Sequence, residues 1–148
     1  GWYSWNYTII EDGKEVAFIE SAWLREAATF FLDGFTFKVY RQGMFGGPFV
    51  LEKNGEAIIF ADKPSAWESS FNVSYLNRQY TLEAQGFFRR RFLLREGERV
   101  IGSAIPDAWC SRTAIGDFPP ELPMALRIFL VWLVIIMWKR QSDAAVVA

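Results

Sequence analysis

The residues best suited to binding a ligand are arginines gathered in one short stretch. Arg89, Arg90 and Arg91 are consecutive, and Arg95 and Arg99 follow closely. On an extended strand, Arg89, Arg91 and Arg95 share one face because successive side chains point to opposite sides. Guanidinium groups bind phosphate oxygens through paired hydrogen bonds. We therefore predict a basic surface for anionic headgroups, to which two residues of an earlier hairpin contribute. The predicted site consists of Arg89, Arg91, Arg95, Arg99, Lys38 and Arg41.

The same arginines have a structural interpretation. A solvent-facing strand often carries arginines that pair with neighbouring carboxylates, here Glu83, Glu96 or Glu98. In that case the stretch is only a solvated surface. The two interpretations differ in whether the guanidinium groups are free to meet a ligand.

Catalytic chemistry finds little support in the composition. The chain has no histidine, which removes the commonest general base and the histidine-containing catalytic triads. Its single cysteine, Cys110, is expected to be an inert core thiol. No phosphate-binding loop, dinucleotide motif or Cys-x-x-Cys pair is present. We expect a protein that is not an enzyme, with no catalytic residue, no metal and no cofactor.

Charge and cysteine content also bear on partners and location. A net charge of −1 gives no general attraction to nucleic acid, so we expect none as a partner. The single cysteine favours a reducing compartment. The first residues lack the basic and apolar regions of a signal peptide. These features predict a cytoplasmic protein, with peripheral contact to a membrane if the basic surface binds lipid.

Residues 122–138 are apolar at every position except Arg127. A helix of this composition has no polar face, so it must be buried in protein or in lipid. In the membrane alternative the helix anchors the domain. However, Lys139 and Arg140 follow the apolar run, which opposes the positive-inside tendency for a C-terminal anchor. Arg127 would also lie inside the bilayer. We therefore expect a helix over about residues 121–140, enclosed by the rest of the chain.

The preceding part of the chain repeats a hairpin that is followed by Ala-Trp. The three copies end at Trp23, Trp67 and Trp109, which lie 44 and 42 residues apart. Asp12-Gly13 and Asn54-Gly55 supply the left-handed backbone positions that the tight turns of the first two hairpins need. Gly97 supplies that position in the third hairpin. Such repetition indicates a repeated supersecondary unit.

The segments between these turns alternate apolar and polar residues, as half-buried strands do. They predict one domain over residues 1–148, with strands between about 3 and 116. A β-trefoil also has three four-strand units, but its filled barrel leaves no room for an apolar helix. We predict a mainly β fold, a closed antiparallel β-barrel of about twelve strands with the C-terminal helix running through it. The expected strands are 3–10, 14–20, 26–32, 35–42, 48–53, 57–62, 70–76, 78–84, 89–95, 99–105 and 110–116.

Residues 100–109 and 115–119, followed by the apolar helix, resemble the closing segment of the phospholipid scramblases and the related tubby C-terminal-like superfamily. The resemblance extends from about Tyr7 to Trp138. It implies a twelve-stranded closed barrel around a C-terminal helix. It also implies lipid-related functions, because tubby domains bind phosphoinositides through basic side chains on the barrel wall. The chain lacks the palmitoylated cysteine cluster and acidic loop of the scramblases, so the resemblance does not carry scrambling over.

Taken with the arginines, these features predict a non-catalytic binding protein. Its expected partner is an anionic phospholipid headgroup or a membrane-associated protein, met through the basic barrel face. The alternative is a structural or protein-interaction module with no small ligand. In another repeat the place of the arginine run is taken by Gly46-Gly47-Pro48, so the repeated fold does not require the charge.

Overall fold

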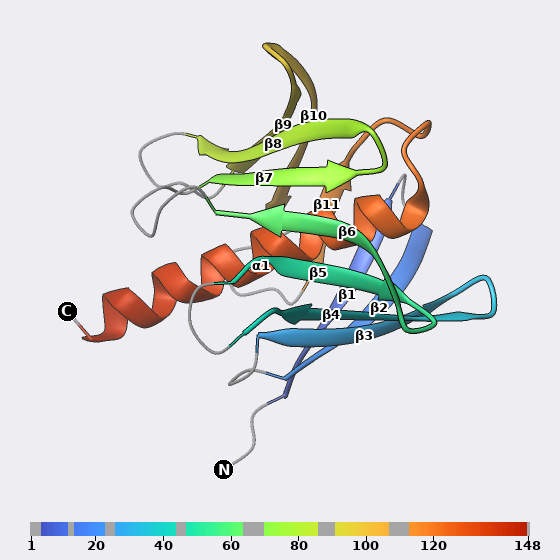
Figure 1. Ribbon diagram of the computed structural model, residues 1–148. Coiled ribbons are helices and arrows are strands. Elements are labelled where there is room, and N and C mark those ends of the chain that lie inside the picture. The colour runs from blue at the N-terminus through green and yellow to red at the C-terminus, as the bar shows by residue number, and fades with distance from the viewer. Residues whose placement is uncertain are drawn as a thin grey trace.

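The structure is a computed structural model. It describes residues 4–11, 14–22, 26–43, 47–63, 70–85, 91–106 and 113–147. The chain is mainly β, with a single C-terminal helix in the described part (Figure 1). Trp23, Trp67, Trp109 and Cys110 lie outside the described residues, as does the Asp12-Gly13 turn.

Every predicted strand is present, with ends within three residues of the expected positions. Nine consecutive strands, β3 to β11, form one antiparallel sheet in which neighbours along the chain are neighbours in space. The strands are β1 (Ser4–Glu11), β2 (Lys14–Ala22), β3 (Ala27–Leu32), β4 (Phe35–Arg41), β5 (Phe49–Lys53), β6 (Glu56–Asp62), β7 (Ser70–Tyr75), β8 (Arg78–Gln85), β9 (Arg91–Glu96), β10 (Arg99–Pro106) and β11 (Thr113–Asp117).

The prediction of a closed, wholly antiparallel barrel of about twelve strands is not confirmed. Strand β2 pairs with β3, and β1 pairs with β2, both antiparallel. The order then returns to β11, where β1 and β11 are parallel over three residue pairs, from Thr8–Thr113 to Ile10–Ile115. The reason is parity. Strands joined by successive hairpins alternate in direction, so the first and last of the eleven strands that the structure describes point the same way.

The described turns follow the predicted chemistry. Asn54 and Gly55 join β5 to β6 with φ of +50° and +87°, which suits the two left-handed positions of a type I′ turn. Gly97, with φ of +63°, begins the two-residue turn between β9 and β10. These turns are four strands apart, as the predicted four-strand repeat requires. Asp33-Gly34 adds a further turn of the same kind.

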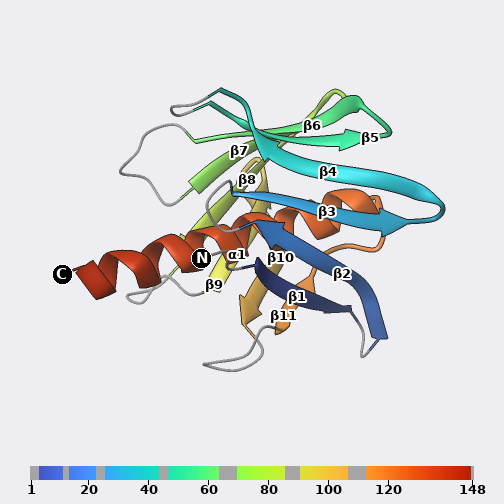
Figure 2. The same ribbon diagram turned by 90° about the horizontal axis from the view of Figure 1, so that it is seen from below.

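Helix α1 (Met124–Val147) begins three residues later and ends seven residues later than predicted. Its start is set by Pro123, whose carbonyl accepts the first helical hydrogen bond, from the Arg127 N–H at 3.1 Å. The sequence after Arg140 has no glycine or proline to end the helix, so it continues. Figures 1 and 2 show α1 running among the strands and projecting from one end of the sheet. We call this end the helix exit.

The apolar helix is enclosed by protein, as predicted. Every residue from Ala125 to Met137 is at most 9% exposed. The strands supply inward-facing side chains around it, including Phe71, Leu82 and Phe92, all at 0% exposure. Gly116 of β11 lies so close to the helix that an added Cβ would be 2.7 Å from Val131 Cγ2. Within the described residues, no helix combines the length and hydropathy needed to cross a membrane.

Arg127, the single charge in the apolar run, is 8% exposed. A charge enclosed in a barrel is expected to reach an acceptor near an open end, here a strand-end carbonyl, Asp117 or Glu121. It does find a backbone acceptor beside the helix start, where its Nε donates to the carbonyl of Leu122 at 3.0 Å. This carbonyl belongs to the segment that leads into α1. Burial of the guanidinium is therefore offset by a hydrogen bond.

Candidate functional site

The six predicted binding residues do not form one surface. Arg91 and Arg95 lie on β9 and Arg99 on β10, whereas Lys38 and Arg41 lie on β4. Four strands separate β4 from β9, and neighbouring strands are about 4.8 Å apart, so the groups lie about 24 Å apart around the sheet. The sixth residue, Arg89, lies outside the described residues. Arg91, Arg95 and Arg99 thus lie on one hairpin, whereas Lys38 and Arg41 lie on a strand well away from it.

Part of the predicted basic wall is neutralised by carboxylates. The Arg95 guanidinium forms an ion pair with Glu83 and also donates to the Glu98 carbonyl at 3.3 Å. Arg78 nearby makes two hydrogen bonds to Glu96, at 2.9 and 2.8 Å. At Arg95 the structure thus agrees with the interpretation in which the arginines pair with neighbouring carboxylates. Arg91 and Arg99 make no ion pair with any residue that the structure describes.

A different group of charged side chains meets at the helix exit. We call it the helix-exit cluster: Glu26, Arg41, Lys63 and Arg140. Glu26 directly precedes β3, Arg41 ends β4, Lys63 follows β6 and Arg140 lies on α1. Residues far apart in the chain thus converge where the helix leaves the sheet.

Glu26 is the anionic centre of this cluster. Arg140 grips its carboxylate with two hydrogen bonds, from Nε at 2.6 Å and from Nη2 at 2.7 Å. Arg41 Nη1 lies 3.4 Å from Oε1 of the same carboxylate, and Arg41 Nε donates to the Gly47 carbonyl at 3.2 Å. Glu26 itself has a φ of +47°, a backbone conformation that non-glycine residues rarely adopt. The helix and two strand ends are therefore tied together through one carboxylate.

Both arginines of the cluster also contact a buried aromatic ring. The guanidinium carbons of Arg41 and Arg140 lie 5.5 and 5.6 Å from the centre of the Phe49 ring, within the range of cation–π contacts. Phe49 is 2% exposed and packs edge to face on Trp132 of α1, with ring centres 5.3 Å apart. The cation positions are thus fixed by a buried aromatic residue and not only by flexible side-chain contacts.

Among the residues that the structure describes, three cations lie around the Glu26 carboxylate in this cluster. The surroundings lower the pKa of Lys63, first because the ammonium is partly buried, and then because Arg140 and Arg41 repel it, while Glu26 acts in the opposite direction. The side chains of Glu26, Arg41 and Arg140 remain 24%, 30% and 29% exposed, so solutes can reach them. Such a site is suited to an anion with oxygen acceptors.

Sequence reasoning found only Arg41 of this cluster. Glu26 and Arg140 are 114 residues apart, and no local motif links them. The one available signal is the Lys139-Arg140 pair directly after the apolar run, because cations at the end of a buried helix need a partner where the helix emerges.

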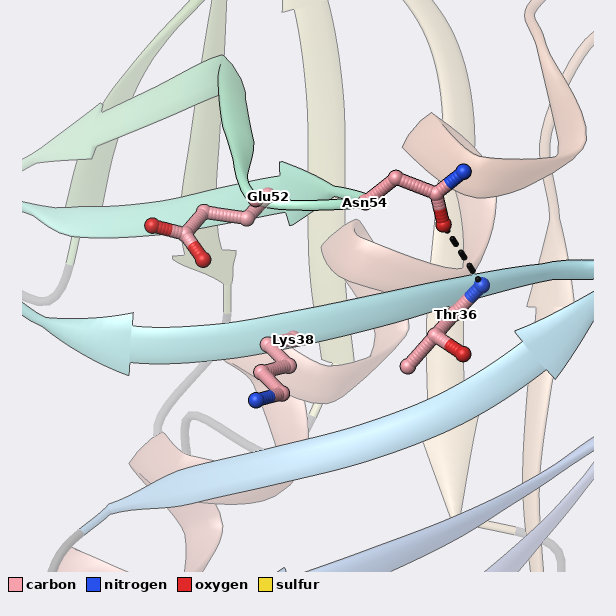
Figure 3. A pocket seen from close by; sticks show the side chains of 5 residues that line it. Thr36, Lys38, Glu52 and Asn54 are labelled. Carbon is pink, nitrogen blue, oxygen red and sulfur yellow. Dashed lines mark hydrogen bonds between the residues drawn. The ribbon is translucent and has the colours of Figure 1, made fainter.

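Lys38 occupies a separate place on the outer surface. It lines a hollow of about 220 Å³ together with Thr36, Glu52, Asn54 and Gly55. Figure 3 shows these side chains on β4, β5 and the following turn, where the Asn54 side-chain oxygen accepts a hydrogen bond from the Thr36 N–H at 3.2 Å. The Tyr40 hydroxyl donates to Glu52 at 2.7 Å, and this bond is the main reason that the pKa of Tyr40 is raised.

Comparisons with known proteins do not place the chain in a family. No family model, curated protein or solved structure matches it. Within the described residues, no group of three or more Cys, Asp or Glu side chains is arranged to hold a metal ion.

Proposed function

We propose that this chain is a non-catalytic binding protein that contacts an anionic phospholipid headgroup through the helix-exit cluster. The supporting observation is the gathering of Arg41, Lys63 and Arg140 around the carboxylate of Glu26. This proposal keeps the expected class of ligand and moves the contact away from the β9–β10 arginines. A membrane-associated protein with an exposed phosphate or carboxylate would satisfy the same chemistry.

Arg140 and Arg41 each have N–H groups that are not used in the contacts described above. Arg140 uses Nε and Nη2 on Glu26, so its remaining N–H groups are available to phosphate oxygens. Arg41 likewise uses Nη1 and Nε, which leaves Nη2. A phosphate group presents several anionic oxygens, and arginine forks match such oxygens in pairs.

We also propose that the fold is a tubby-like barrel of the scramblase type, in which a closed sheet surrounds the C-terminal helix. Three features support the assignment: the strand order, the four-strand spacing of the described tight turns, and an apolar helix enclosed by the sheet. An experimental structure tests it directly. Superposition of its strands on a tubby domain, strand by strand and around the same central helix, is the expected result.

Vesicle co-sedimentation tests the lipid proposal. The purified 148-residue chain is mixed with phosphatidylcholine vesicles, alone or with phosphatidylserine or a phosphatidylinositol phosphate. Binding should require the acidic lipid. It should also fall steeply between 0.1 M and 1 M salt, where the Debye length shrinks from about 10 Å to about 3 Å. Lys63→Gln and Arg41→Gln should each weaken binding, because each removes one charge from the cluster.

The matched control is Arg91→Gln combined with Arg99→Gln, which removes two cations from β9 and β10. This variant should bind as the unchanged chain does. If it loses binding while Lys63→Gln retains it, the ligand lies on the originally predicted wall and the proposed site is wrong.

A structural or protein-interaction module is the second candidate. The pairing of Arg95 with Glu83 and of Arg78 with Glu96 favours it, because paired arginines cover a surface without needing a ligand. Failure of the unchanged chain to sediment with any acidic vesicle at low salt would favour this function over lipid binding.

A further inference from the structure

The outer face of β4 and β5 carries a charged pair that does not form an ion pair. Lys38 and Glu52 are directly opposite in the strand register. Yet Lys38 makes no hydrogen bond or ion pair with any described residue, while Glu52 accepts the Tyr40 hydroxyl through Oε1. One ammonium group and the second carboxylate oxygen are therefore available at the 220 Å³ hollow.

Two further polar groups border this hollow. The Asn54 oxygen is engaged with the Thr36 N–H, which fixes the amide and leaves its NH₂ group as a donor. The Thr36 hydroxyl is both donor and acceptor. The hollow thus combines donors and acceptors without excess charge, since Lys38 and Glu52 cancel. This separates it from the helix-exit cluster, which is positively charged.

An exposed aromatic side chain lies beside these polar groups. Phe31 on β3 is 74% exposed and pairs directly with Thr36 of β4, so both side chains point to the outer face. Directly opposed residues of an antiparallel pair have Cβ atoms about 4.5–5.5 Å apart. A phenyl ring in water beside fixed polar groups is a platform for the apolar face of a ligand whose edges carry hydroxyl groups.

We propose that this face binds a neutral polyhydroxylated ligand, a single sugar ring, with its C–H face on Phe31 and its hydroxyl groups on Lys38, Glu52 and Asn54. Pockets for drug-sized ligands have volumes of about 300–1,000 Å³. The hollow of about 220 Å³ is smaller than these, so its size agrees with a single sugar ring. The balanced charge favours a neutral ligand over phosphate. The proposal does not depend on lipid binding, since the two sites share no residue.

Saturation-transfer and amide-shift NMR on the whole chain test this site. The probes are methyl glucoside, methyl galactoside and methyl mannoside at millimolar concentration, with glycine and inorganic phosphate as charged comparisons. At least one glycoside should shift the amides of β3, β4 and β5. Phe31→Ala should weaken that binding about tenfold, as expected for loss of an aromatic contact. Phe31→Trp should retain it, because the platform is preserved.

Leu76→Asn is the matched control, because Leu76 is 79% exposed but lies on the turn after β7. It should leave binding unchanged. Since Phe31 is mostly exposed, Phe31→Ala should fold normally, and Glu52→Gln provides a second variant that should weaken binding. Absence of any shift with all three glycosides overturns the proposal. Binding that survives both Phe31→Ala and Glu52→Gln also overturns it, as does a response to glycine or phosphate alone.

Discussion

Trp132 provides the sharpest test of how the helix is enclosed. Its side chain is 0% exposed, stacks on Phe129 with ring centres 6.5 Å apart, and packs edge to face on Phe49. Its indole Nε1 is buried with no hydrogen-bond partner among the described residues. Two substitutions therefore separate two contributions: Trp132→Ala removes the packing, and Trp132→Phe removes the unpartnered N–H while keeping an aromatic ring.

The expected magnitudes differ clearly. Trp132→Ala should lower the free energy of unfolding by about 3–5 kcal/mol, as large core truncations do. Trp132→Phe leaves a void of roughly 40 Å³, which costs about 1 kcal/mol at about 24 cal/mol per Å³. Removing a buried unsatisfied donor recovers about 1–3 kcal/mol. Trp132→Phe should therefore fall within about 1–2 kcal/mol of the unchanged protein.

Urea unfolding followed by circular dichroism measures both variants, with equal m-values as the condition for comparing free energies. Phe129→Ala is the control, because it truncates a neighbouring buried ring that has no polar atom, and it should cost about 3–5 kcal/mol. A cost below about 1 kcal/mol for Trp132→Ala would refute burial of the helix within the sheet. Equal costs for Trp132→Phe and Trp132→Ala would refute the argument about the indole N–H.

Three further outcomes are expected. Gly116→Ala should destabilise the protein by about 1–3 kcal/mol in the same assay, because its Cβ would meet Val131 Cγ2 at 2.7 Å; an unchanged urea midpoint would contradict this contact. Leu76→Asn should raise the free energy of unfolding by roughly 0.5–1 kcal/mol, since Leu76 has a φ of +53° that asparagine tolerates better; a decrease would show that the leucine has a packing role. Tyr40→Phe should destabilise the protein by about 1 kcal/mol through loss of the bond to Glu52. Because the pKa of Tyr40 is raised from 10.0, this contribution should be full below pH 10 and decline as the pH rises through its folded-state value, so the variant and the unchanged protein should converge at high pH.

Local sequence was sufficient for the elements themselves. Alternation of apolar and polar residues located the strands to within three residues, because a side chain's face follows directly from its position along a strand. Asn54-Gly55 located a turn because few other residues tolerate its backbone angles. The run from Leu122 to Trp138 required enclosure because it has no polar face.

The placement of the charges was decided by the tertiary structure. Lys38 and Arg95 were predicted to share one basic surface, but the strand order puts them on separate parts of the sheet, and Arg95 has a carboxylate within reach. Likewise, the odd number of strands in the described part of the chain makes the β1–β11 pair parallel, which no single strand specifies. Glu26 meets Arg140 across 114 residues only because the helix returns through the sheet to the end where β3 begins. A sequence determines which way each side chain faces, whereas only the folded arrangement determines which faces meet.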